Sequence, residues 1–299
     1  MTKQFQSVII CTIAIGLAVP PIAAAQQYTT IDFPGAIVSF LSGGPNPQGT
    51  SVGVYTDTSN VTHGFVLTKK GVFTSFDVPG STFTGPNFIS PQGDIVGSYN
   101  DASSVSHGFI LSGGHFTTVN FPGAPGTILT GVTPSGEMSG ATCSDPACGV
   151  FGAINATHGF LVSKKGVFSP TFDPPGAVSS VATIVIPSGA VFGQYDKVVE
   201  GTCFTQCQGY MLFHGAFATI NFPGSSFTGI GGANAEGNAV GFYLDASGVG
   251  HGLLFNGVYT SFDYPGAIFT QATGINPRGV IVGLYVDSAF VIHGFIRTP

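Results

Sequence analysis

The sequence has no tryptophan and few charged residues, with 8 Lys and Arg against 14 Asp and Glu among 299 residues. The formal net charge of −6 argues against a nucleic-acid partner, which would require a dense face of Lys and Arg. The absence of Trp counts mildly against a sugar-stacking platform, since Trp and Tyr usually supply one. Metalloprotease H-E-x-x-H, phosphate-loop and C-x-x-C-H haem motifs are also missing from the chain.

Helix-favouring stretches are lacking as well, because no segment after the N-terminus is rich in Ala, Leu, Glu and Lys at helical spacing. Glycine is abundant instead, with 45 residues, and 27 Phe stand among many Thr and Val. This composition predicts short strands joined by tight turns.

Residues 1–25 have the three parts of a secretory signal: Lys3, an apolar core, and small residues at Ala23 and Ala25. A membrane anchor is the weaker interpretation, because the apolar run is short and ends at Pro20. We expect cleavage after Ala25 and a soluble product that is secreted, either extracellular or periplasmic.

Four cysteines remain after the signal, and an even number in an oxidising compartment predicts disulfides. The most local pairs are Cys143–Cys148 and Cys203–Cys207, although cross-pairing between the two loops is also possible. A zinc site is disfavoured because the usual short paired spacing is absent.

One unit recurs six times along the chain. The run "IVGLYVDSAFVIHGF" at 281–295 has copies of equal length at 51–65, 95–109 and 239–253, and longer altered copies begin at Met138 and Val191. A Pro-Gly motif and an "NPxG"-like turn keep step with it, at a period of about 42–53 residues that is typical of propeller blades.

Each unit contains four predicted strands, A to D. The chain after the signal begins with an isolated strand D at "YTTIDFPG" and ends on a strand C at "HGFIRTP". The first strand therefore supplies what the last unit lacks, and pairing them removes exposed edges. We predict an all-β fold: one six-bladed β-propeller domain over 26–299, closed by an N-terminal strand.

Strand B carries a glycine in every unit, although glycine weakens a strand. Its expected use is to make room for a large side chain from a neighbouring strand, and Phe65, Phe109 and Phe295 are candidates. This glycine pattern therefore indicates core packing.

With Gly274–Gly283 reading "GINPRGVIVG" and His293-Gly294-Phe295 following, the chain resembles the extracellular HAF-family repeat proteins, with Gly in place of their Ala. The fourth unit departs most, having Gln208-Gly209-Tyr210 and no His. The resemblance implies export and a repeat fold, and it brings no catalytic residues.

The repeated Asp and His of the B–C hairpin could look like a chemical site. A catalytic centre needs one converging constellation, whereas equivalent copies around a ring favour a hydrogen bond that locks each loop. The predicted structural clasps are Asp57/His63, Asp101/His107, Asp245/His251 and Asp287/His293.

The loop face should also gather the strand-D residues Asp32, Asp77, Asp173 and Asp263. Such an acidic rim could attract Ca²⁺. We favour the alternative, in which each Asp caps its own turn, and we expect no cofactor and no metal.

Specific binding is best sought where the repeat symmetry breaks, in the longer B–C loops of units three and four. Loops held by disulfides on a rigid ring can present a binding surface. The candidate ligand-binding residues are Asp145, Asp196, Lys197 and Glu200, and plain decorated loops are an equally good interpretation.

The leading hypothesis is an exported, non-enzymatic, monomeric binding or scaffold protein. Its partner would be an extracellular protein, a glycan or a surface. The alternative is a secreted polysaccharide hydrolase or lyase that uses loop-face carboxylates. Two unpaired carboxylates converging at the mouth would favour the enzyme, whereas carboxylates engaged in their own turns would count against it.

Overall fold

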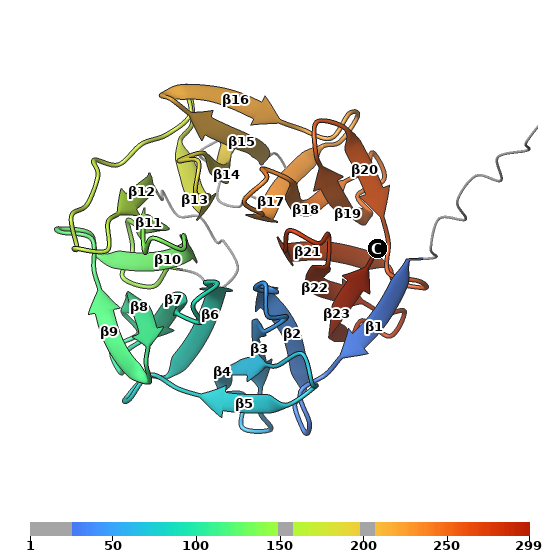
Figure 1. The fold of residues 1–299 in the computed structure, drawn as a ribbon, viewed down its shortest axis with the longest axis horizontal. Coiled ribbons are helices and arrows are strands. Elements are labelled where there is room, and N and C mark those ends of the chain that lie inside the picture. Colours follow the sequence, from blue (N-terminus) through green and yellow to red (C-terminus); the bar gives the residue numbers. More distant parts are fainter. Residues whose placement is uncertain (1–25, 149–157, 198–206) are drawn as a thin grey trace, which may run out of the picture.

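The computed structural model describes residues 26–148, 158–197 and 207–299, and these form 23 strands arranged around a central axis (Figure 1). Within these ranges the chain forms no helix that is long and apolar enough to cross a membrane. The predicted all-β propeller fold is confirmed.

The blades follow one another around the ring in chain order, each with its first strand nearest the axis (Figure 1). Blade 1 consists of β2 (Val38–Gly43), β3 (Ser51–Thr56), β4 (Thr62–Leu67) and β5 (Phe73–Phe76). Blade 2 consists of β6 (Phe83–Ile89), β7 (Ile95–Asn100), β8 (Ser106–Ser112) and β9 (His115–Val119). Blade 3 contains β10 (Gly126–Val132), β11 (Met138–Cys143) and β12 (His158–Val162).

Blade 4 consists of β13 (Ser179–Val185), β14 (Val191–Asp196), β15 (Gln208–Phe213) and β16 (Ala216–Ile220). Blade 5 consists of β17 (Phe227–Ala233), β18 (Ala239–Leu244), β19 (Gly250–Phe255) and β20 (Tyr259–Phe262). Blade 6 combines β21 (Phe269–Ile275), β22 (Ile281–Val286) and β23 (Ile292–Thr298) with the N-terminal β1 (Gln27–Ile31).

Ring closure by the N-terminal strand is confirmed. β1 pairs antiparallel with β23, in a register that sets Tyr28 opposite Arg297 and Ile31 opposite Gly294. The Tyr28 ring meets the Tyr264 ring edge-on at 5.5 Å. β1 therefore both completes the hydrogen-bond ladder of blade 6 and covers part of its core.

The strand-B glycines accommodate bulky neighbours, as the sequence predicts. A Cβ on Gly53 would lie 2.4 Å from the Phe65 ring and 2.3 Å from the Phe40 carbonyl oxygen. Gly97 faces Phe109 in the same way, and Gly193 faces Tyr210. Glycine therefore recurs in strand B of all six blades because this strand lies in close contact with both flanking strands.

Blade 3 departs from the predicted four regular strands. Its outer segment is held only by isolated bridges, Gly159 with Phe172 and Val162 with Phe168. Pro170 lies between these bridges, and because proline has no N–H it interrupts the ladder.

Residues 49–53 spell G-x-S-x-G, the pattern of a hydrolase nucleophile elbow. The structure places Ser51 at the start of β3, where only 1% of the residue is exposed. β3 continues into an antiparallel hairpin with β4 instead of entering a helix. The local fold is therefore not a nucleophile elbow.

Candidate functional site

The repeated histidines contact two acceptors each. His63 Nδ1 lies 2.8 Å from Asp77 Oδ2, and its Nε2 lies 3.5 Å from Asp57 Oδ2. The other predicted clasps have Nε2–Oδ2 distances of 3.2 Å for His107 and Asp101, 3.5 Å for His251 and Asp245, and 3.5 Å for His293 and Asp287. The clasp residues thus lie side by side, but the B–C Asp is the more distant partner of each His.

The acceptor that lies closer to each His is at the end of strand D, and the predicted Asp/His pairs did not include it. Beyond Asp77, these partners are Asn120 at 3.0 Å from His107, Asp263 at 3.0 Å from His251, Asp32 at 3.0 Å from His293 and Asp173 at 2.8 Å from His158. A sequence signal existed, because in the first five blades an Asp or Asn follows each of these His residues by 12 to 15 positions.

Each B–C Asp also holds its own turn. Asp57 Oδ1 accepts hydrogen bonds from the Ser59 and Val61 backbone N–H groups, at 2.8 and 2.9 Å. The Val61 bond is the main reason that the pKa of Asp57 is lowered. The pKa of Asp101 and of Asp287 is lowered in the same way, and hydrogen bonds led by the Ser247 hydroxyl lower the pKa of Asp245 to about 2.

Aromatic stacking extends the clasp into the core. Tyr285 stacks on His293 with ring centroids 5.0 Å apart, and on its other side Tyr264 stacks on Tyr285 at 3.6 Å. Blade 1 repeats this column with Phe33, Tyr55 and His63. Blade 5 repeats it with Phe222, Tyr243 and His251. Phe33, Phe222 and Tyr264 each lie in the loop that leaves the preceding blade, so each column joins neighbouring blades and is a structural element.

These engaged carboxylates give little support to a glycosidase. Every Asp of the four clasps accepts backbone hydrogen bonds within its turn. Among the described residues, no group of three or more His, Cys, Asp or Glu side chains is placed to hold a metal ion. The expectation of no metal on the rim, and calcium as its alternative, both stay untested.

The clasp of blade 5 should make folding stability depend on pH. Burial disfavours the charged His251 imidazole, but hydrogen bonds and charge attraction from Asp263 and Asp245 outweigh this, so the pKa of His251 is raised. A raised folded-state pKa adds stability that is complete below about pH 6.5 and fades as the pH rises through the folded pKa. The lowered pKa of Asp245 adds stability that is lost as the pH falls towards about 2.

We therefore expect His251→Gln to lower the melting temperature more at pH 5.5 than at pH 8.5, measured by calorimetry. His115→Gln is the matched control, because His115 is an exposed residue of β9 outside the clasps. An equal loss for His251→Gln at both pH values would contradict this electrostatic role.

The described part of the longer loop of blade 3, residues 144–148, follows β11 directly. The predicted disulfide Cys143–Cys148 is present, and the Ser106 hydroxyl lies 3.0 Å from the Cys148 N–H, which docks this loop on blade 2. Asp145 is exposed. Cys203 and Glu200 lie outside the described residues, so the Cys203–Cys207 pairing is not described.

The remaining candidate residues, Asp196 and Lys197, are in blade 4. Asp196 is 5% exposed at the end of β14, whereas the Lys197 ammonium lies 5.5 Å from the centroid of the Tyr195 ring. None of Asp145, Asp196 and Lys197 lines the cavity on the propeller axis. Their role in binding stays a prediction.

A ring of polar side chains surrounds the axis, one from each innermost strand except β17. Every innermost strand has a β-bulge that leaves one residue unpaired. The bulge residues are Ser42, Asn87, Thr130, Thr183, Gly231 and Thr273.

Most of these side chains join neighbouring blades. Asn87 Nδ2 donates to the Leu129 carbonyl at 2.8 Å, and Thr273 Oγ1 donates to the Leu41 carbonyl at 2.8 Å. Ser42 donates to the Pro86 carbonyl and Thr130 to that of Ala182. Each acceptor is the residue just before the next bulge, so these bonds seal the blade junctions at the axis.

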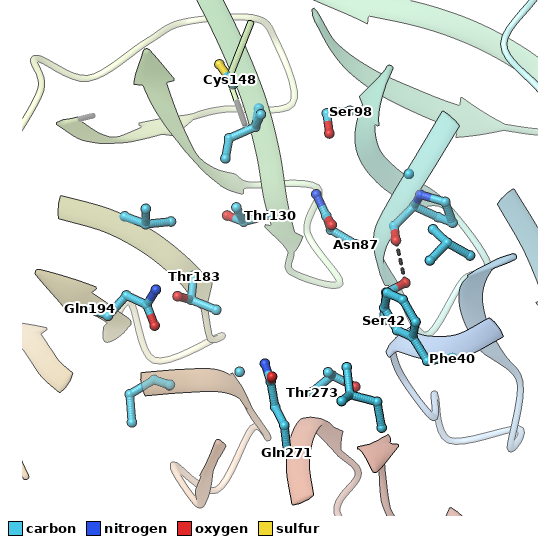
Figure 2. A pocket seen from close by; sticks show the side chains of 18 of the residues that line it. Phe40, Ser42, Asn87, Ser98, Thr130, Cys148, Thr183, Gln194, Gln271 and Thr273 are labelled. Atoms are coloured by element: carbon cyan, nitrogen blue, oxygen red, sulfur yellow. Dashed lines mark hydrogen bonds between the residues drawn. The ribbon is translucent and has the colours of Figure 1, made fainter. Parts of the chain in front are cut away.

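Above this ring, towards the B–C loops, lies a cavity of about 300 Å³ (Figure 2). Ser98, Gln194 and Gln271 extend into it from three different sides (Figure 2). No described residue forms a hydrogen bond with their side chains, nor with the Thr183 hydroxyl. Cys148 also lines the cavity, so the disulfide loop forms part of its wall.

On the opposite side of the ring, a smaller cavity of about 90 Å³ lies among the A–B turns, and Phe88 lines it. Phe88 of blade 2 packs against the core cluster of blades 4 and 5 that contains Ile184 and Ile230, so it reaches across the axis. The neighbouring blades have glycine at the equivalent position, and a Cβ on Gly131 would lie 2.7 Å from Ile184. Among the described residues, the larger cavity is therefore closed towards the A–B turns and open only towards the B–C loops.

The strand order and ring closure define a six-bladed β-propeller. No family model and no curated protein matches the chain in sequence. Solved structures match it in fold. A mutant of AofleA from Arthrobotrys oligospora is 9% identical, with a TM-score of 0.54 over 91% of this chain and 86% of that one.

The fucose-binding lectin of Aleuria aurantia, a six-bladed propeller, is 11% identical with a TM-score of 0.52, over 90% of this chain and 93% of the lectin. TolB from Acinetobacter baumannii is 12% identical with a TM-score of 0.53, over 79% of this chain and 60% of TolB. At such identities the likeness shows the fold alone.

Proposed function

We propose that this chain is an exported, non-enzymatic binding protein that takes a glycan in the axial cavity on its B–C face. The observation that carries the proposal is the cavity itself. It is lined by all six blades, and polar side chains that form no hydrogen bond with a described residue extend into it. Ligand sites are typically concave and mostly apolar, with a few convergent polar groups.

Two further observations support parts of the proposal. The Aleuria aurantia lectin binds α-methyl-L-fucoside, so proteins of this fold class include sugar-binding ones. The Cys143–Cys148 disulfide fits an oxidising compartment, in agreement with the signal-like residues 1–25. We further propose membership of the HAF repeat proteins, on the Gly-Ile-Asn and His-Gly-Phe pattern.

Filling the cavity should abolish binding. Ser98 in blade 2 corresponds to Phe242 in blade 5: both face a glycine in a Phe-Thr-Gly segment of the innermost strand. Ser98→Phe therefore introduces a side chain that the fold already accepts. On an array of glycans and polysaccharides, we expect the parent protein to bind and Ser98→Phe to lose at least about 100-fold in affinity.

Ser103→Phe is the matched control, because Ser103 is exposed in the B–C turn of the same blade. It should bind like the parent. If Ser98→Phe folds and retains the parent's affinity, the axial cavity is not the binding site.

A further inference from the structure

We infer that the axial cavity holds the uncharged terminal residue of a carbohydrate chain, inserted end-on and recognised by Gln194 and Gln271. This inference rests on the proposed function and narrows its ligand. Four properties of the cavity carry it: the absence of charge, the placement of polar groups, the apolar walls and the single opening.

The lining argues for a neutral ligand. None of the described residues that line the cavity is Asp, Glu, Lys, Arg or His. A charged ligand group would lose its hydration in this cavity and find no counter-charge there, which costs free energy. Anions would also approach the ring of loop carboxylates formed by Asp57, Asp101, Asp245 and Asp287.

Three polar side chains that form no hydrogen bond with a described residue come from alternate blades. Ser98 lies on blade 2, Gln194 on blade 4 and Gln271 on blade 6, and they surround the axis (Figure 2). Each side-chain amide both donates and accepts, as sugar hydroxyls do. A compact ring with hydroxyls around its circumference satisfies this arrangement, because its partners lie on three sides.

Apolar side chains from all six blades line the cavity between these polar points, including Phe83 of blade 2, Val181 of blade 4 and Leu284 of blade 6. Phe40 and Val54 line the cavity from blade 1, Ile128 from blade 3, and Phe227 with Phe242 from blade 5. The two rings of blade 5 contact each other with centroids 4.7 Å apart. Such walls fit the C–H faces of a sugar ring.

The single opening selects a chain end. The ring of inter-blade hydrogen bonds and Phe88 close the cavity below, so a polymer cannot thread through the propeller. An internal sugar residue is linked to the polymer on both sides, so two segments of the polymer would have to leave through one opening. A terminal residue has one linkage and needs only one exit.

The test uses Gln194→Met and Gln271→Met, which keep side-chain length and remove the amide. On the array, glycans that end in a neutral residue should bind, and the same glycans capped with an acidic sugar should not. Each variant should weaken the binding of the best neutral glycan roughly tenfold. Gln92→Met, an exposed residue on an A–B turn, is the matched control and should bind like the parent.

Equal binding by parent, Gln194→Met and Gln271→Met would overturn the inference, as would a preference for acid-capped or internal residues. Either result leaves glycan binding itself in place. A parent protein that binds no glycan on the array overturns the proposed function and this inference together.

Discussion

Deletion of residues 26–32 from a chain that begins at Gln26 should lower the melting temperature of the whole ring by about 10 °C or more. β1 contributes five paired residues to β23 and covers the core of blade 6 with Tyr28. The deletion also removes Asp32, which lies 3.0 Å from His293. We expect a loss of about 3–5 kcal/mol in the free energy of unfolding, and the loss should affect all blades because an open ring exposes an edge.

Calorimetry of the shortened chain measures this effect, and a peptide spanning residues 26–34 provides its control. Because the peptide can add a strand to the exposed edge of β23, it should restore part of the lost stability. A shortened chain that melts at the temperature of the longer one would show that β1 does not close the ring.

Gly283→Ala should be one of the two most damaging single methyl additions in blade 6, together with Gly274→Ala. The new Cβ would lie 2.0 Å from the Gln271 carbonyl oxygen and 2.9 Å from the Phe295 ring. The carbonyl belongs to the backbone of β21, which is paired with β22, so it cannot move without breaking the ladder. We expect a loss of about 4 kcal/mol or more, seen in chemical denaturation or as failure to fold.

Gly159→Ala is the matched control, since its Cβ would lie 3.1 Å from the Phe172 ring and 3.3 Å from the Cβ and backbone nitrogen of Ala182. It should cost about 1 kcal/mol or less. Comparable losses for the two variants would contradict the close packing that we assign to the strand-B glycines.

The fold could be predicted from the sequence because each repeat unit carries its own turn and strand signals. The decisive observation was the phase of the repeat: "YTTIDFPG", just after the signal-like residues 1–25, is a strand D, and "HGFIRTP" at the other end is a strand C. The structure pairs these segments as β1 and β23. The regular outer strand of blade 3 was predicted wrongly, because Pro170 interrupts its pairing.

The clasps were predicted only in part. Asp287 and His293 lie in one hairpin, so their proximity follows from local spacing. The closer partner of His293 is Asp32, 261 residues away, and only ring closure brings them together. Comparing blades 1, 2, 3 and 5, where the partner follows each His by 12 to 15 residues, would have revealed it.

The axial cavity could not be predicted from the alternation of residues along a strand. A β-bulge shifts this alternation by one residue, so the direction in which a side chain points cannot be counted through it. Thr273 occupies such a bulge, and Gln271 precedes it on the same strand. Their positions at the axis became clear only from the register of β21 and β22.

The most direct test of the account is a crystal structure of the protein with the neutral glycan that it binds best. We predict a terminal sugar on the axis, with its hydroxyls within hydrogen-bond distance of the Gln194 and Gln271 amides. A sugar bound between blades, or on the Cys143–Cys148 loop with the axis empty, would contradict the account.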